Sequence, residues 1–190
     1  KLHAVIAIDD SVAYYQSDDQ GVHWTKSKDL EGIARKIFIV PSSLKEKRTL
    51  YICGSNFITA RENGIWKTNP GPAKVDKLTE YTGGFDREHN RFIIYAISGK
   101  SYFNPEGDPS GIYYTDNGGK TWENRQENLL KHCIKNADPP EWRTLATCAG
   151  YPGTVYVSYN GLKTHKDTIC MGVAKSEDFG KTWKLVWRDR

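Results

Sequence analysis

One short pattern recurs along this chain with constant internal spacing. It reads S/T-x-D/N-x-G-x-x-W, and three segments fit it: SDDQGVHW at 17–24, TDNGGKTW at 115–122 and SEDFGKTW at 176–183. We name these segments box 17, box 115 and box 176. The recurrence indicates one small structural unit that the chain uses several times, which constrains the fold more than any other feature of the sequence.

Each matched position of the box has a physical role in a turn. The Asp or Asn side chain can accept hydrogen bonds from amides of its own turn, and the hydroxyl can brace the same turn. Gly adopts positive φ, and Trp opens the returning strand with a large apolar surface that we expect to be buried. Strand-like segments flank each box, so each is predicted to be a hairpin turn. The residues with these structural roles are Ser17, Asp19, Gly21, Trp24, Thr115, Asn117, Gly119, Trp122, Ser176, Asp178, Gly180 and Trp183.

A degenerate copy lies between the first two boxes. In TARENGIW at 59–66, Gly64 comes one place late and Arg61 stands at the acid position. The four copies therefore start at 17, 59, 115 and 176, with intervals of 42, 56 and 61 residues. A period of roughly 40 to 50 residues with several short strands per unit is typical of a β-propeller, and the two longer intervals require insertions.

The sequence thus predicts an all-β fold, a β-propeller of four-stranded antiparallel blades in which the box joins the third and fourth strands. We expect a single partial domain over 1–190, with blades at 1–28, 31–69, 74–126 and 141–190. The first blade lacks its first strand. Because propellers close with ~4 to 8 blades, we favour a part of a larger ring over a four-bladed ring closed by a strand from elsewhere.

The box pattern closely resembles the Asp-box, or BNR, repeat family of β-propellers, and the resemblance extends over almost the whole chain. That family includes sialidases, xyloglucanases and other glycoside hydrolases, some polysaccharide lyases, sortilin-type receptors and a photosystem assembly factor. The box therefore implies architecture and not activity. In the propeller enzymes of this resemblance, substrates bind near the axis on the face opposite the boxes.

Long insertions are expected on that opposite face. Loops in compact domains that are longer than a connection between strands requires are often functional. The loop SGKSYFNPEGDPSG at 98–111 contains Glu106 and Asp108 beside Tyr102. Two carboxyl groups and aromatic rings are the components of a glycosidase subsite, so we name both acids as candidate catalytic residues and Tyr102 as a substrate contact. A solvated turn of the same composition is the alternative.

A second group of candidates opens the first strand of the last blade. Glu141 is a further candidate catalytic carboxylate, and Trp142 and Arg143 are candidate substrate contacts. Arg143 could bind the carboxylate of a uronic or sialic acid through two parallel hydrogen bonds. The arginine triad of sialidases cannot be assembled here, because only Arg143 is well placed. A surface salt bridge is the alternative.

The loop NGLKTHKD at 160–167 supplies the last candidates, His165 and Lys163. Neighbouring cations lower the proton affinity of a histidine, which suits a neutral base or a substrate contact. A solvated loop histidine is the alternative.

Composition and charge exclude several classes of protein. Of 190 residues 38% are hydrophobic, and no apolar run approaches the ~18 residues of a membrane span. The net charge of +4 is mild, and Lys and Arg are not concentrated in a basic arm, so no nucleic-acid partner is expected. No metal-ligand spacing or phosphate loop stands out, so we expect no metal and no cofactor.

The four cysteines contain no C-x-x-C pair. We expect free thiols, with Cys148 and Cys170 buried in strand-like runs. A disulfide that involves Cys133 is the alternative.

These observations and the resemblance lead to a functional hypothesis. The chain is expected to be a carbohydrate-active propeller, part of a secreted, extracellular or periplasmic glycoside hydrolase that acts on a complex or acidic glycan, with a polysaccharide lyase as the weaker enzymatic choice. The alternative is a non-catalytic Asp-box propeller that serves as a protein-binding or assembly scaffold. The expected partners are a glycan substrate or a protein, together with the remaining blades of a larger chain.

Overall fold

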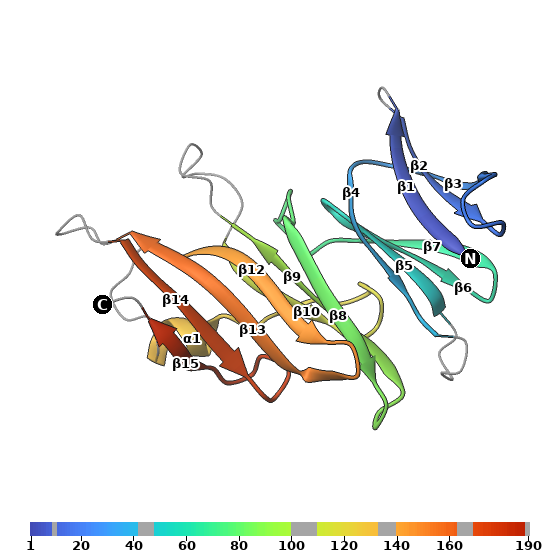
Figure 1. Ribbon diagram of the computed structural model, residues 1–190. Coiled ribbons are helices and arrows are strands. Elements are labelled where there is room, and N and C mark those ends of the chain that lie inside the picture. The colour runs from blue at the N-terminus through green and yellow to red at the C-terminus, as the bar shows by residue number, and fades with distance from the viewer. Residues whose placement is uncertain (9–10, 42–47, 100–109, 133–139, 163–168, 189–190) are drawn as a thin grey trace.

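The computed structural model describes residues 1–8, 11–41, 48–99, 110–132, 140–162 and 169–188 of the chain. Its strands form four antiparallel sheets, which lie in a row in chain order (Figure 1). Within each sheet every strand pairs with the next along the chain. The all-β class and the antiparallel strand units predicted from the sequence are therefore confirmed.

The sheets are numbered by their order along the chain. Sheet 1 has three strands and the others have four: sheet 1 is β1 (Leu2–Ile8), β2 (Ser11–Ser17) and β3 (Thr25–Leu30); sheet 2 is β4 (Ala34–Ile39), β5 (Arg48–Gly54), β6 (Phe57–Glu62) and β7 (Ile65–Pro70); sheet 3 is β8 (Glu80–Asp86), β9 (Arg91–Ser98), β10 (Gly111–Thr115) and β11 (Glu123–Asn124); sheet 4 is β12 (Glu141–Cys148), β13 (Tyr151–Leu162), β14 (Ile169–Ser176) and β15 (Lys184–Arg188).

One helix interrupts this pattern and was not predicted. α1 (Glu127–His132) lies in the connection between sheets 3 and 4. Its Leu129 is fully buried in the core between those sheets, so the connection is anchored by an apolar contact. In the described part of the chain no helix is long and apolar enough to cross a membrane.

The two middle sheets are buried on both faces. Along β9, Phe92 and Ile94 pack toward sheet 2, whereas Ile93 and Tyr95 pack toward sheet 4. Successive side chains of a strand point to opposite faces, so a strand that is apolar at every position needs a neighbouring sheet on each side. β9 is buried at every position from Phe92 to Ser98, which is the consequence of this arrangement.

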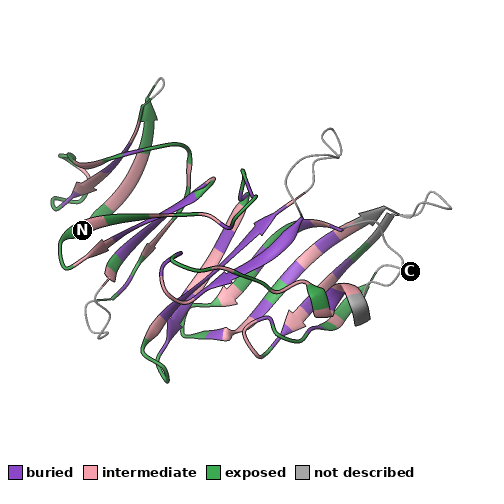
Figure 2. Ribbon diagram, turned by 180° about the vertical axis from the view of Figure 1, so that it is seen from behind, coloured by how far each residue is buried: buried purple, intermediate pink, exposed green. Residues whose placement is uncertain are grey.

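Three hydrophobic clusters fill the three spaces between consecutive sheets. Tyr14 of sheet 1 packs with Ile52 and Phe57 of sheet 2. The next two clusters repeat this contact between sheets 2 and 3 and between sheets 3 and 4. Figure 2 shows the buried residues concentrated in the middle of the row, whereas sheet 1 is largely exposed or intermediate. Each sheet is therefore held mainly by its neighbours.

The three boxes have the same hydrogen-bond network. In box 176 the Ser176 hydroxyl donates to Asp178 Oδ1 (2.8 Å) and accepts from the Gly180 amide (2.8 Å), while Asp178 Oδ1 accepts from the Thr182 amide (2.8 Å). Box 17 and box 115 repeat these three bonds at 2.7 to 3.1 Å. Gly180 has φ of 81°, as predicted for this position, and the residue before it, Phe179, is also left-handed at 61°. The hydroxyl, the acid or amide, and the glycine of each box therefore hold its turn together.

The degenerate copy forms a different turn. Glu62 pairs directly with Ile65, so the loop has only Asn63 and Gly64, which have φ of 50° and 82°. Positive φ at both loop residues is the signature of a type I′ hairpin, which Asn-Gly favours. The missing acid at Arg61 is therefore compensated by a tighter turn, and the guanidinium of Arg61 lies 5.7 Å from the centre of the Trp66 ring.

The tryptophan of a box contacts the sheet that precedes it in the chain. Trp183 Nε1 donates to the Arg125 carbonyl, just after β11 (2.8 Å), and Trp122 Nε1 donates to the Pro70 carbonyl at the end of β7 (3.2 Å). Trp183 is 4% exposed, and Trp122 is partly buried against the cluster between sheets 2 and 3. The predicted burial is thus confirmed for Trp183 and holds in part for Trp122.

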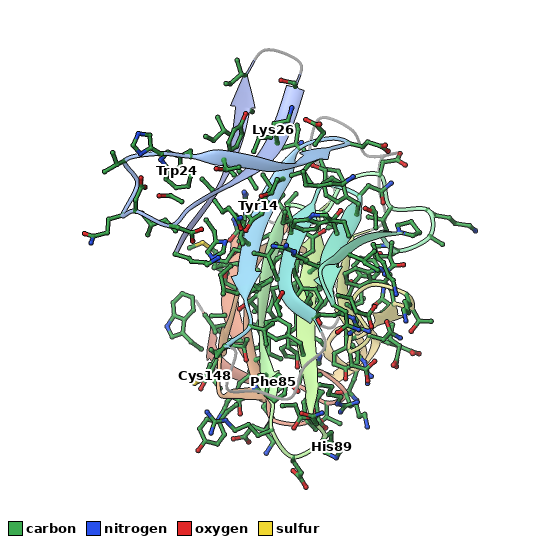
Figure 3. All side chains as sticks on the ribbon, turned by 90° about the vertical axis from the view of Figure 1, so that its right-hand side faces the viewer. Tyr14, Trp24, Lys26, Phe85, His89 and Cys148 are labelled. Carbon is green, nitrogen blue, oxygen red and sulfur yellow. The ribbon has the colours of Figure 1, made fainter. Side chains whose placement is uncertain are left out.

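The prediction that the box tryptophans are buried is wrong for Trp24, which is 39% exposed. Its indole N–H donates to the Gly21 carbonyl of its own turn (3.0 Å) and not to another sheet. Figure 3 shows Trp24 near the edge of the molecule, at the end of the sheet 1 hairpin. The turn forms without its tryptophan being buried, since burial comes from a preceding sheet.

The two described cysteine side chains are free. Cys53 is buried in β5, but Cys148 at the end of β12 is exposed, which corrects the prediction that its thiol is buried. Cys148 pairs with Tyr151 across a short turn where β12 leaves the core, so an apolar sequence run extends beyond the buried part of its strand. The side chains of Cys133 and Cys170 lie outside the described residues.

We expect Trp183→Ala to lower the free energy of unfolding by about 3 to 5 kcal/mol, the usual range for a buried Trp. Trp24→Ala should lower it by less than half as much, because that ring is already 39% exposed. Urea unfolding of both variants measures the difference. Equal losses would show that the two rings contribute alike, contrary to their different surroundings.

The box network predicts a graded effect at Asp178. Burial alone would raise the pKa of this carboxyl, but hydrogen bonds from Thr182 and Ser176 outweigh it and lower the pKa. Asp178→Ala removes the acceptor and should destabilise the fold by about 1 kcal/mol or more. Asp178→Asn should cost less, because Asn117 fills this position in box 115 and bonds the Thr121 amide at 3.1 Å. Urea unfolding measures the free energies of unfolding of both variants, with the exposed Glu177→Gln as control. Equal losses of stability in Asp178→Ala and Asp178→Asn would contradict this prediction.

Candidate functional site

Most of the residues predicted to contact a ligand lie outside the described residues. These are Tyr102, Glu106, Asp108, Lys163 and His165. Their roles remain predictions. The three that are described, Glu141, Trp142 and Arg143, open β12.

β12 begins at the end of sheet 4 that lies away from box 176. Glu141 pairs with Asn160 near the end of β13, whereas box 176 begins at the last residue of β14, Ser176, which pairs with Val155. Glu141 and Arg143 form an ion pair with 2.6 Å between Oε2 and Nη2. The predicted alternative for Arg143, a salt bridge at the surface, is therefore present.

The amide of Asn160 completes a polar group that we name the strand-start cluster: Glu141, Arg143 and Asn160. With its amide oxygen turned toward Arg143, Asn160 accepts hydrogen bonds from Nε at 3.1 Å and from Nη2 at 3.2 Å. The guanidinium is thus held between a carboxylate and an amide oxygen. The fixed donor geometry of arginine makes this a well-defined polar surface.

The strand-start cluster remains open to solvent. The Glu141 and Arg143 side chains are 38% and 52% exposed. An exposed ion pair contributes about 0 to 1 kcal/mol, so a ligand that offers equivalent hydrogen bonds can replace part of it. The salt bridge and a binding role are therefore compatible.

Trp142 does not have the role that was predicted for it. It is 3% exposed, its indole N–H donates to Gln126 Oε1 (3.1 Å), and its ring meets Tyr159 edge to face. A buried ring cannot stack on a sugar. Trp142 anchors the start of β12 in the core, so the neighbouring Glu141 and Arg143 are presented from a rigid strand.

A second carboxylate at an equivalent position was missed by sequence reasoning. Glu80 opens β8 as Glu141 opens β12, and each is followed by a buried aromatic residue, Tyr81 or Trp142. The far ends of the two strands are joined, since the Phe85 amide donates to the Ala149 carbonyl at 2.8 Å. Both glutamates therefore lie at the end away from the boxes. The signal was the Glu-aromatic pair that opens both β8 and β12.

A hollow of about 590 Å³ lies on the opposite end, between the turn after β8 and box 176. Tyr151 and Glu177 are among the residues around it, and the buried carboxylate of Asp86 lies at its wall. Figure 3 shows His89 and Phe85 at this end of the molecule. Sequence reasoning did not predict a concave surface here, because its walls come from segments far apart in the chain.

Asp86, at the wall of this hollow, is paired with two basic side chains of its own turn, His89 and Arg91. We name Asp86, His89, Arg91 and Asp116 the turn network. Asp86 Oδ2 accepts a hydrogen bond from Arg91 Nε (3.1 Å) and lies 2.8 Å from His89 Nδ1. Arg91 also bonds Asp116, which precedes Asn117 of box 115, and its guanidinium lies 5.3 Å from the centre of the Phe179 ring. These contacts tie sheet 3 to box 176, so we assign the turn network a structural role.

The pKa of Asp86 reflects these contacts. Burial by itself would raise it, but hydrogen bonds from His89 and Arg91 outweigh burial and lower the pKa from its ordinary value. The carboxylate is therefore held in its charged form by partners of the fold.

No protein-family model matches this chain, and no curated protein matches it.

The turn network predicts acid sensitivity. Because the folded pKa of Asp86 is depressed, its contribution is present above the ordinary value of 3.8 and is lost as pH falls through the lower folded value. Asp86→Asn should reduce the free energy of unfolding by about 1 to 3 kcal/mol near pH 7, and the difference from wild type should shrink in acid. Urea unfolding across this pH range measures it.

Asp29→Asn is the matched control, since Asp29 pairs with Lys26 and its side chain is 71% exposed. It should change the free energy of unfolding by less than about 1 kcal/mol. A difference for Asp86→Asn that is constant across the acid range would contradict the ionic origin of its effect.

Proposed function

We propose that this chain is part of a carbohydrate-active β-propeller of the Asp-box type, and that the end away from the boxes binds a glycan. The propeller proposal is supported by four consecutive meander sheets that pack face to face, and by three boxes with the same hydrogen bonds. The first strands β8 and β12 lie next to each other, as the innermost strands of neighbouring blades do. Extracellular or periplasmic location belongs to the same proposal.

The single observation that carries the binding proposal is the strand-start cluster. Arg143 supplies donors in a plane, and Glu141 and Asn160 supply acceptors beside it. Adjacent hydroxyls of a sugar both donate and accept, so they can bond to such a pair at the same time. A ligand carboxylate can instead bind Arg143 bidentately, and it must then compete with Glu141.

Cleavage of the glycan is proposed to use carboxyl groups around this end. Retaining glycosidases place their two carboxyl groups ~5 to 5.5 Å apart and inverting ones ~6.5 to 9.5 Å apart. Glu141 and Glu80 open neighbouring first strands, and Glu106 and Asp108 belong to the loop predicted to lie at the same end. These four are the candidates for general acid, base or nucleophile.

The second candidate function is a scaffold that binds protein. One observation favours it: sheet 1 exposes large apolar side chains that the middle sheets bury, including Ile6 at 38% and Ile8 at 58%. Exposed apolar surface of this kind is typical of protein contacts.

Binding titrations against a uronic acid, a sialic acid and a neutral oligosaccharide test the glycan proposal. Arg143→Lys should weaken binding of an acidic sugar at least tenfold, which is about 1.4 kcal/mol, because lysine cannot form two parallel hydrogen bonds. Glu141→Gln separates the two modes. It should strengthen binding of an acidic sugar, because the Glu141 carboxylate no longer competes with the ligand carboxylate for Arg143. It should weaken binding of a neutral sugar, because an amide is a weaker acceptor for the sugar hydroxyls than a carboxylate.

Arg87→Lys is the matched control, because Arg87 lies beside the hollow at the opposite end of the sheets. Its affinities should equal those of wild type. If none of the sugars binds, or if Arg143→Lys binds acidic and neutral sugars as wild type does, the glycan proposal fails and the scaffold is favoured.

A further inference from the structure

Two first strands have an arginine at the same irregular position near their start. In β12 the pairing with β13 skips Arg143, which follows Trp142. In β4 the pairing with β5 skips Arg35, which follows Ala34. Trp142 and Ala34 both pack toward the preceding sheet, so the two arginines occupy equivalent places. A β-bulge of this kind redirects the side chain of its extra residue, and both arginines are exposed.

The start of β4 is joined directly to the start of β8. The Ser55 amide donates to the Ile33 carbonyl, just before β4, at 2.9 Å. The Leu78 amide, just before β8, donates to the Ser55 carbonyl at 2.6 Å. β12 lies along the other side of β8, so the three first strands are neighbours in the order β4, β8, β12 (Figure 1). The bulge of Arg35 therefore lies at the same end of the sheets as the strand-start cluster.

The start of β4 is a cationic surface. Arg35 and Lys36 are adjacent and exposed, and neither forms an ion pair with another described residue. Burial raises the pKa of Tyr81, and the charge of Arg35 opposes that rise, so the guanidinium lies near the Tyr81 hydroxyl. This hydroxyl donates to the Gly54 carbonyl at 2.5 Å. Arg35 is thus placed at the junction of β4 with β8.

The spacing of the two arginines fits two separate negative groups. Sheets that pack face to face are about 10 Å apart, and β8 lies between β4 and β12, so the two bulges are separated by roughly 10 to 20 Å. Carboxylates on different units of one oligosaccharide can span such a distance, whereas the two oxygens of a single carboxylate lie side by side. Glu80 opens the strand between the arginines, and its carboxylate accepts hydrogen bonds from uncharged hydroxyls.

We propose that Arg35 and Lys36 form a second anion subsite beside the strand-start cluster, and that the ligand is an oligosaccharide with carboxylates on at least two of its units. One carboxylate binds Arg143 and another binds Arg35, while sugar hydroxyls between them meet Glu80. This inference rests on the proposed glycan binding and specifies its substrate class. Sequence reasoning missed Arg35, because the bulge that exposes it depends on the pairing of β4 with β5.

Binding titrations with a uronic acid monosaccharide and a tetrasaccharide of the same acid test the proposal. Wild type should bind the tetrasaccharide more tightly. Arg35→Gln should weaken tetrasaccharide binding by roughly three- to tenfold, the range for one exposed hydrogen bond between charged groups, and leave monosaccharide affinity unchanged. The double variant Arg35→Gln with Lys36→Gln should lose more. Arg87→Gln removes the same charge beside the hollow at the opposite end, and it should bind both sugars as wild type does.

The outcomes separate this inference from the glycan proposal. If Arg143→Lys weakens monosaccharide binding but Arg35→Gln binds the tetrasaccharide as wild type does, the second subsite is overturned and the glycan proposal stands. If wild type binds neither sugar, both fail. Equal losses for the two sugars in Arg35→Gln would mean that both arginines bind one carboxylate, which contradicts separate subsites. An equal loss in Arg87→Gln would assign the effect to overall charge and would also overturn the second subsite. Circular dichroism confirms that the variants are folded.

Discussion

The two-sided burial of the middle sheets is the constraint on which the rest of this structure depends. β9 is buried from Phe92 to Ser98, and its alternate side chains belong to two different cores. A single meander of this kind would leave both of its apolar faces in water, so it is stable only when packed between neighbouring sheets. The tryptophan contacts of box 115 and box 176 connect one sheet to the preceding one.

The local architecture could be predicted from the sequence because it depends on local chemistry. The strands that flank the boxes, such as β10, were predicted because alternating or continuous apolar runs end at turn residues. The box turns were predicted from hydroxyl, acid and glycine spacing, and their bonds join residues at most four positions apart.

What could not be predicted depends on residues far apart in the chain. Trp24 and Trp183 occupy the same position of their boxes, yet Trp183 is buried against sheet 3 whereas Trp24 is 39% exposed and donates to its own turn. Arg91 and Asp116 are 25 positions apart, and only the pairing of strands brings them together. At the candidate site, a surface salt bridge was the alternative given for Arg143, and its partner Glu141 is two positions away. The contribution of Asn160, in contrast, requires the register of β12 and β13.

Hydrogen exchange of the backbone amides tests most directly the central claim, that the middle sheets are stabilised by neighbours on both faces. Amides of β9 should be the most protected and those of β1 among the least, because in the described part of the chain only one face of sheet 1 packs against another sheet. Protection in β1 equal to that in β9 would show that the sheets are stable individually, and would contradict the account.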